Sequence, residues 1–500
     1  MNALQPSTLK RYGFISEFFV ILCVLNFSIG YYMIKQNVIN ILIYFLFLQI
    51  INIGVSYRLA ELLLALIVKK KDLEKNTCLS FFPRVALLYV TYNDAIPKYL
   101  KELSYQNYSN YDIYILDDSD EEEFIKIVNS FDYKILRRTT RSGFKAGCLN
   151  NWLRLHGNKY KYFIISDSDS SFDKNFIKNM VVYAEHESNR NVAIFQSKIL
   201  PSNIINSFSE AVGLMIPIAM YVHEKLGNDC KTILSWGHNN LHRTKYIKYI
   251  GGFDENFVAE DYATSITLIK KGFDCKLVDV ISYEEVPQTI QSYTQRYIRW
   301  AKQTIELRKI SKDGLCFATK LHLFMGFYTY TIWIIVFLGM TIAAWGYSTS
   351  SEDVIFMIDY IVSYGFFESE PVISAIILFY VFDLIIFRLP LVSKLSIPII
   401  KYWKSVFLTI SIHSYIMFLL TKSVLKTLLG EKVRFEVTKK GFEDSRLSFM
   451  QILKRMDFGL FLNLLLLIGI INNPLFLFFN YLWTIPLLLS PIVIYLLQEK

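Results

Sequence analysis

The stretch FIISDSDSSF places two carboxylates, Asp167 and Asp169, one residue apart after a short apolar run. Such a run predicts a buried strand, so the pair stands where a strand ends. Carboxylate oxygens are the ligands that Mg²⁺ and Mn²⁺ prefer, and a bound ion can complete its shell with diphosphate oxygens. The alternative is an Asp-rich turn that caps a helix beginning near Phe172. We expect the pair to hold Mg²⁺ or Mn²⁺.

Two further polar clusters follow strand-like runs, one after residues 84–92 and one at the end of residues 111–118. Each cluster alone is as consistent with a turn as with a site. In a parallel sheet, however, ligands bind beyond the carboxyl ends of the strands, which meet at one edge. The candidate binding residues in these clusters are Thr91, Tyr92, Asp94, Asp117 and Asp118.

Two helix-like segments add groups of other kinds. Glu260 and Asp261 begin an amphipathic helix, where a carboxylate either caps the helix or serves as a general base. In QRYIRWAKQ (295–303), Arg299 offers a planar fork for phosphate oxygens, and Trp300 offers a flat apolar face. Arg and Trp are also ordinary membrane-interface anchors. The sequence has no G-x-x-x-x-G-K-[ST] motif, which argues against an ATPase.

The elements that must position these groups are strand-like runs at 84–92, 111–118, 161–167, 191–197 and 275–283. Helix-like segments separate the first four runs, and this alternation predicts an α/β domain with a mostly parallel sheet. Residues 72–310 carry these runs together with mixed charge and turn signals. That length is sufficient for one complete core.

The remainder of the chain is strongly apolar. Of 500 residues, 53% are hydrophobic and 16% aromatic, which is typical of an integral membrane protein. Apolar stretches close to the thickness of a bilayer core predict transmembrane helices at 14–34, 39–67, 321–346, 371–392, 457–473 and 475–497.

Charge placement predicts the orientation in the membrane. Lys10 and Arg11 precede the first expected span, Lys69 to Lys71 follow the second, and the acidic loop 347–370 has no Lys or Arg. These features predict a multi-pass plasma-membrane protein with a cytosolic α/β domain. The net charge of +9 then reflects loops that face the lipid bilayer or an anionic substrate, and no nucleic-acid partner is needed. Residues 399–429 either span the membrane or lie in its interface, and we favour the interface because a polar stripe repeats at every fourth residue.

These motifs, in this order, resemble those of the membrane-embedded family 2 glycosyltransferases, particularly the cellulose synthase type. The resemblance covers roughly residues 10–500. It is carried by TYND (91–94), DD (117–118), KAGCLN (145–150), DSD (167–169), AED (259–261), RYIRW (296–300) and FEVTKKG (435–441). The last motif is similar to the family's F-x-V-T-x-K gating loop, which favours glucan synthases over hyaluronan-type enzymes.

The resemblance implies a fold, a reaction and a set of partners. The fold is a GT-A-like α/β domain inserted between transmembrane helices. The reaction is processive, inverting polymerisation of UDP-glucose into a β-linked capsular or extracellular glucan that crosses the plasma membrane. The partners are a UDP-sugar donor, the growing polysaccharide and the bilayer, and the sequence identifies no protein partner.

The resemblance also divides the chain and implies residue roles. The expected segments are 1–71 (tail and two spans), 72–310 (catalytic domain ending in an interface helix), 311–398 (two spans), 399–455 (interface helix and gating loop) and 456–500 (two spans). Catalysis is expected of Asp261 as the base, with Glu260 beside it and Arg299 on the departing UDP. The implied substrate contacts are Tyr92 and Asp117 at the uridine, Lys145 at the diphosphate, Trp300 at the terminal sugar, and Phe435, Thr438 and Lys440 in the closing strip.

Two departures from the family pattern concern the acceptor. Arg296 stands where the family has Gln, and SWGHNN (235–240) replaces a motif of small residues with bulky Trp236 and His238. The linkage is therefore left open. Three alternatives also stay open: the same chemistry on UDP-N-acetylglucosamine or another donor, a non-processive transferase acting on a lipid-linked acceptor, and a polysaccharide transporter with an inactive catalytic domain.

Overall fold

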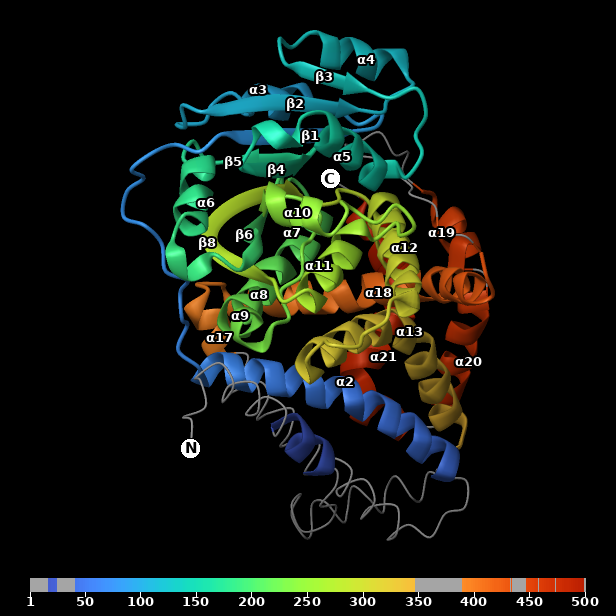
Figure 1. The fold of residues 1–500 in the computed structure, drawn as a ribbon. Helices are drawn as coiled ribbons and strands as arrows, with labels where there is room; N and C mark the ends of the chain where they lie inside the picture. The colour runs from blue at the N-terminus through green and yellow to red at the C-terminus, as the bar shows by residue number, and fades with distance from the viewer. Residues whose placement is uncertain are drawn as a thin grey trace, which may run out of the picture.

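The structure is a computed structural model that describes residues 17–24, 41–346, 389–431, 433, 447–456, 458–472 and 474–498. Its centre is an eight-stranded sheet (Figure 1). The strands are β1 Val85–Thr91, β2 Tyr111–Asp117, β3 Lys134–Arg137, β4 Tyr162–Asp167, β5 Ser170–Phe172, β6 Val192–Ser202, β7 Asn240–Arg243 and β8 Asp274–Glu285.

The strand order is β3-β2-β1-β4-β7-β6-β8-β5. Four pairings are parallel, namely β1 with β2, β1 with β4, β2 with β3, and β6 with β8. The other three, β4 with β7, β6 with β7, and β5 with β8, are antiparallel. The prediction of a mostly parallel α/β sheet is confirmed, as are the five predicted strands. The three short strands β3, β5 and β7 were not predicted from the sequence.

The register brings the expected polar clusters to one edge. Thr91 pairs with Asp117, and Val90 pairs with Asp167 on the other side of β1. Three strands therefore end side by side. Helices of the α/β part surround this sheet: α3 Pro97–Glu102, α4 Glu122–Asn129, α5 Phe144–Leu155, α6 Phe176–Ala184, α7 Ser207–Gly213, α8 Met215–Val222, α9 Asn228–Cys230, α10 Thr244–Tyr249, α11 Glu260–Lys270 and α12 Ile290–Glu306.

Strand alternation divides the core between the two faces of the sheet. Val85 and Leu87 of β1 pack with buried residues of α3 and α6, whereas Ala86 and Leu88 pack with Trp152 of α5 on the opposite face. Successive side chains of a strand point to opposite faces, so one strand supplies both layers. The sheet is therefore covered on both faces, and the polar residues follow where the apolar runs of β1, β2 and β4 stop.

The remaining helices lie mostly beneath the α/β part, with α19 to its side (Figure 1). They are α2 Ile41–Ile67, α13 Phe317–Gly346, α17 Leu389–Lys394, α18 Ile399–Leu428, α19 Phe449–Met456, α20 Phe458–Asn472 and α21 Pro474–Leu497. A shared apolar core joins α12 to α18, α19 and α21, and contains Tyr293, Ile416 and Ile494. Helix α12 is thus tied to α18, α19 and α21.

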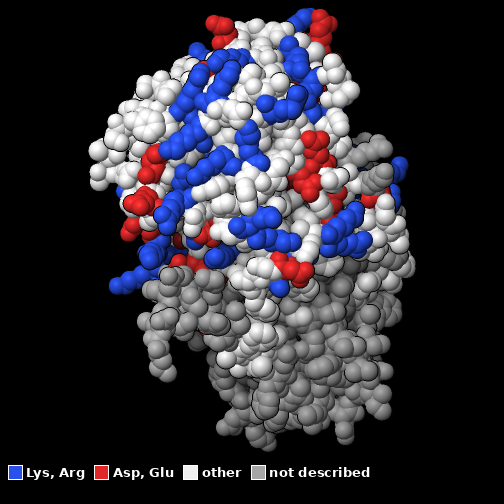
Figure 2. Space-filling model, viewed as in Figure 1, with Lys and Arg blue, Asp and Glu red and all other residues white. Residues whose placement is uncertain are grey.

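Within the described ranges, no single helix has the length and hydropathy of a membrane span, whereas the bent pair Ile399–Met417 and Leu419–Leu428 of α18 does. Most of the expected spans 14–34 and 371–392, and the loop 347–370, lie outside the described residues. On the face seen in Figure 2, Lys and Arg spread over the α/β part, with Asp and Glu among them.

Candidate active site

The DSD turn at the end of β4 is held from both sides. Lys145 of α5 donates a hydrogen bond to Asp167 Oδ1 at 2.5 Å. The buried Asp169 lies 3.9 Å from the guanidinium of Arg296 on α12. Between them, the Ser168 carbonyl accepts from the Tyr89 hydroxyl at 3.1 Å. The strand end, α5 and α12 therefore converge on the two carboxylates.

Asp94 links the TYND turn to the DSD turn. Its Oδ1 accepts from the Thr91 hydroxyl at 2.8 Å and from the Tyr92 backbone N–H at 3.0 Å. Its Oδ2 accepts from the Ser168 hydroxyl at 2.6 Å. Asp94 and the buried Thr91 therefore hold the Tyr92 backbone and the Ser168 hydroxyl in place.

The aspartate pair at the end of β2 is matched by an arginine pair at the end of β3. Arg137 donates to the buried Asp117 at 2.8 Å, and Arg138 donates to Asp118 at 2.9 Å. Arg138 also donates to the carbonyls of Ser142 and Phe144, at 2.7 and 2.9 Å. The ion pair of Asp118 thus anchors the loop that leads into α5 and Lys145. Sequence reasoning missed both arginines because β3 was not predicted.

Tyr92 is in contact with a third arginine that the sequence analysis missed. The guanidinium of Arg141 lies 3.4 Å from the centre of the Tyr92 ring, and the Tyr92 hydroxyl donates to Asp120 at 3.3 Å. Burial lowers the pKa of Arg141. Tyr92 and Arg141 together present an aromatic ring and a cation beside the polar edge, which suits a nucleotide base and phosphate.

Lys145 is the cation around which the carboxyl groups gather. Burial alone would lower its pKa, but Asp167 and Glu260 outweigh that effect and raise it. Burial raises the pKa of Glu260, and the neighbouring Asp261 raises it further. Burial likewise raises the pKa of Asp261, although the Tyr262 N–H and Lys145 oppose it. The pair at the start of α11 is therefore in electrostatic contact with the DSD turn.

The loop before β7 closes over Asp261. Gly237 has φ +85°, and a Cβ built on it would lie 2.9 Å from Asp261 Oδ2. The Gly237 backbone therefore lies so close to the Asp261 carboxylate that no side chain would fit between them. Its backbone conformation also favours glycine. Asp261 Oδ1 accepts from the Tyr262 N–H at 2.8 Å, which fixes the carboxyl group.

A second charged cluster surrounds Asp169. Arg296 lies 3.2 Å from Glu284 of β8, and His238 lies 3.7 Å from the same carboxylate. Several buried polar atoms here have no hydrogen-bond partner among the described residues: Ser170 Oγ, His238 Nδ1, Asn239 Oδ1 and Arg296 Nε. Buried polar atoms are normally paired, so this group is suited to receive the hydroxyls of a ligand.

Arg299 and Trp300 occupy the next turn of α12. Burial and Arg296 lower the pKa of Arg299, whereas Asp167 opposes them. Trp300 is 37% exposed, and its ring lies 5.4 Å from that of Tyr297. Arg299 is thus placed near the DSD charges, and Trp300 beside it presents a partly open aromatic face.

Not every predicted site residue can be placed. Phe435, Thr438 and Lys440 lie outside the described residues. In the described part of the chain, no group of three or more His, Cys, Asp or Glu side chains could hold a metal ion. The expected metal ligands, Asp167 and Asp169, belong to no such group among these residues, and their role stays a prediction.

Family membership follows from residues 162–497, which match the family model "Glycosyl transferase family group 2". This match covers well over half of the chain, and the chain belongs to that family. The prediction of a nucleotide-sugar-dependent glycosyltransferase is thereby confirmed. Together with the sheet topology, it identifies the α/β part as a GT-A-like domain.

Curated relatives include proteins named glucans biosynthesis glucosyltransferase H. The one from Xylella fastidiosa is 26% identical over 270 residues, which are 47% of this chain and 41% of the relative. The one from Xanthomonas euvesicatoria is 23% identical over 317 residues, 54% of this chain and 48% of the relative. The matched region therefore spans less than half the length of these relatives.

Solved structures similar to this chain include a mannosyltransferase from Pyrobaculum calidifontis in complex with GDP-Man and Mn²⁺. It shares 16% identity at a TM-score of 0.49, covering 78% of this chain and 100% of that one. Residues 1–349 of S. aureus TarS with UDP-GlcNAc share 13% identity at a TM-score of 0.31, covering 71% of this chain and 94% of that one.

Proposed function

We propose that this protein is a membrane-bound, processive, inverting glucosyltransferase that polymerises UDP-glucose into a β-linked glucan and passes the polymer across the plasma membrane. The observation that carries the proposal is the convergence on Lys145, which holds Asp167 at 2.5 Å and whose pKa is raised by Asp167, Glu260 and Asp261. One cation thus joins the expected diphosphate end of the site to its expected base. The names of the curated relatives support the choice of glucan.

The donor would lie along the polar edge of β2, β1 and β4. Tyr92 and Arg141 supply the ring and cation for the uridine side, and Asp117 closes that end through its bond to Arg137. Lys145 and Arg299 supply positive charge for the diphosphate. Charge that builds on the departing UDP is best stabilised by groups that are already fixed in place. Lys145 is such a group, because its contacts hold its side chain.

The two carboxylates of the DSD turn fit a divalent cation. Both are oxygen donors at one strand end, and each lies beside a protein cation, Lys145 or Arg296, which supports a place for positive charge here. Asp167 and Asp169 would hold Mg²⁺ or Mn²⁺ together with donor oxygens. When bound, the ion would neutralise charge on the diphosphate.

Transfer itself would be a single displacement. The acceptor hydroxyl oxygen forms a bond to C1 of glucose as the bond from C1 to the β-phosphate oxygen breaks, and UDP leaves with that electron pair. The hydroxyl proton passes to Asp261, whose pKa is raised by burial and therefore closer to that of a useful base. Attack opposite the leaving group inverts the α-linked donor to a β-linked product.

The acceptor would lie on the side of Asp169 and α12. The unpaired buried atoms of Ser170, His238, Asn239 and Arg296 suit sugar hydroxyls, and Trp300 offers a face for the terminal ring. A sugar ring packs well on an aromatic face because its C–H groups are apolar. The strip 435–441 would cover the donor from the cytosolic side, as the family resemblance implies.

A donor panel tests the proposal. Purified protein with Mg²⁺ or Mn²⁺ is expected to release UDP from UDP-glucose and to incorporate glucose into polymer. Preferential use of UDP-N-acetylglucosamine would replace the glucose assignment. The absence of UDP release from every UDP-sugar, with intact protein and both ions present, would favour the transporter alternative.

A further inference from the structure

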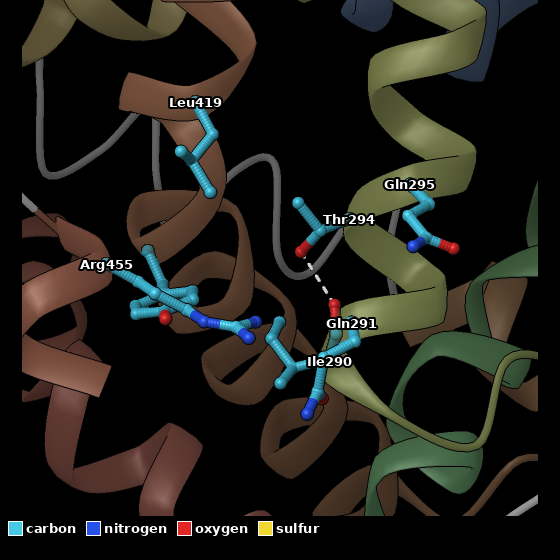
Figure 3. A pocket seen from close by; sticks show the side chains of 7 residues that line it. Ile290, Gln291, Thr294, Gln295, Leu419 and Arg455 are labelled. Atoms are coloured by element: carbon cyan, nitrogen blue, oxygen red, sulfur yellow. Dashed lines mark hydrogen bonds between the residues drawn. The ribbon is translucent and has the colours of Figure 1, made fainter. Parts of the chain in front are cut away.

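A cavity of about 230 Å³ lies between α12, α18 and α19. It is lined by Gln291, Thr294 and Gln295 of α12, Tyr415 of α18 and Arg455 of α19, with apolar groups between them (Figure 3). At about 100° per residue, Gln291 and Thr294 lie about 140° and about 160° around α12 from Arg296, whereas Gln295 lies one turn before Arg299. None of the lining residues is among those assigned to the glycosyl-transfer site, so the cavity is a separate site next to it.

The lining favours an anion. Among the lining residues that the structure describes, Arg455 carries the one charge, and no carboxylate is present. In Figure 3 its guanidinium extends from α19 toward Ile290 and Gln291 at the first turn of α12. The backbone N–H groups at the start of a helix also favour negative charge. The amide side chains of Gln291 and Gln295 can donate further hydrogen bonds.

Size and surroundings indicate the kind of anion. The cavity is smaller than the ~300–1,000 Å³ typical of small-molecule sites, so it suits a phosphate headgroup better than a nucleotide sugar. The helix after Arg455, α20, exposes Phe461, Leu464, Ile468 and Ile471 at helical spacing. Such a stripe is suited to lipid chains, and a cation just beyond its end is suited to their headgroups.

We propose that this cavity binds the phosphate headgroup of an anionic phospholipid, with Arg455 as the principal contact. Leu419 lines the cavity at the bend between Ile399–Met417 and Leu419–Leu428 of α18. The bound lipid thus contacts α18 and α19, the two helices that flank the strip 435–441 in the sequence, and the first two turns of α12. The proposal rests on membrane placement and is independent of the glycosyl-transfer chemistry.

The test is retention of short-chain phosphatidylglycerol by the purified full chain, counted by native mass spectrometry without nucleotide. Arg455→Gln is expected to weaken retention about tenfold, the loss of one charge-assisted hydrogen-bonded contact. Lys454→Gln is the matched control, because it removes the same charge from the neighbouring position on α19, which is exposed as Arg455 is but does not line the cavity. Arg455→Lys, which keeps the charge and loses the planar fork, is expected to give an intermediate result.

Three outcomes would overturn the proposal. Equal losses in Arg455→Gln and Lys454→Gln would mean diffuse attraction to a basic surface. Equal retention of phosphatidylcholine would mean that the anionic charge is not recognised. Protection of the cavity by inorganic phosphate alone, with no lipid retained, would assign it to a soluble anion. An unchanged unfolding midpoint shows that Arg455→Gln has folded, and unchanged UDP release separates lipid binding from catalysis.

Discussion

Replacement of Asp261 by Asn tests the proposed base most sharply. The amide has nearly the same shape as the carboxylate, and its oxygen can still accept from the Tyr262 N–H, now at 2.8 Å. The bond between Lys145 and Asp167, on the donor side, involves neither oxygen of Asp261. The substitution therefore removes proton acceptance and leaves the proposed donor contacts in place.

The expected loss of activity follows from the role of Asp261 as the general base. General base catalysis contributes about 10²- to 10⁴-fold, which is about 2.7 to 5.4 kcal/mol of transition-state stabilisation. That loss should appear in kcat, whereas KM for UDP-glucose should stay within about threefold because donor binding is preserved. In the wild type, kcat/KM should fall as pH falls through the pKa of Asp261. Burial raises that pKa, so the acid limb should lie above the range of an ordinary aspartate.

The assay is UDP release from UDP-glucose by purified protein across pH, with Glu260→Gln as the matched control. Glu260 is buried beside Asp261, so this change removes the adjacent carboxyl group and leaves the proposed base in place. The control should therefore retain far more activity than Asp261→Asn. A kcat for Asp261→Asn within about threefold of wild type would refute the base assignment. An equal loss in both variants would point to a structural role for the start of α11.

The other predictions concern the groups around Asp261. Lys145 lowers the pKa of both Glu260 and Asp261, so Lys145→Gln should shift the acid limb of kcat/KM to higher pH. An acid limb that does not move would contradict the electrostatic contact between Lys145 and this pair. Gly237→Ala should cost activity beyond its backbone strain, because the new methyl would meet Asp261; Gly272→Ala, with φ +88° and nothing within 4 Å, controls for strain alone. Chelation with EDTA should abolish turnover, and added Mn²⁺ or Mg²⁺ should restore it. Asp169→Asn should weaken that restoration. Undiminished turnover in EDTA would exclude a catalytic role for the metal.

The sequence predicted the larger strands because they are apolar runs that end in polar residues. β3, β5 and β7 have only four, three and four residues, too few to show a period. The missed β3 had a consequence for the site, since Arg137 and Arg138 at its end pair with Asp117 and Asp118. Contacts between strands distant in sequence depend on the register, which a single sequence does not state.

The polar edge was predictable for a topological reason. Parallel strands bring their carboxyl ends together, so Asp117 and Asp167 had to lie near one another once the sheet was assumed. The stacking of Arg141 on Tyr92 and the approach of Gly237 to Asp261 were not predictable. Both depend on how loops fold back over the edge, and neither leaves a periodic signal.

The most direct test of the account is the size of the product made from radiolabelled UDP-glucose in a pulse followed by an unlabelled chase. The account predicts a long polymer that keeps growing through the chase, carries β-linkages and disappears in Asp261→Asn. Transfer of a single glucose to a lipid-linked acceptor, or an α-linked product, would contradict it.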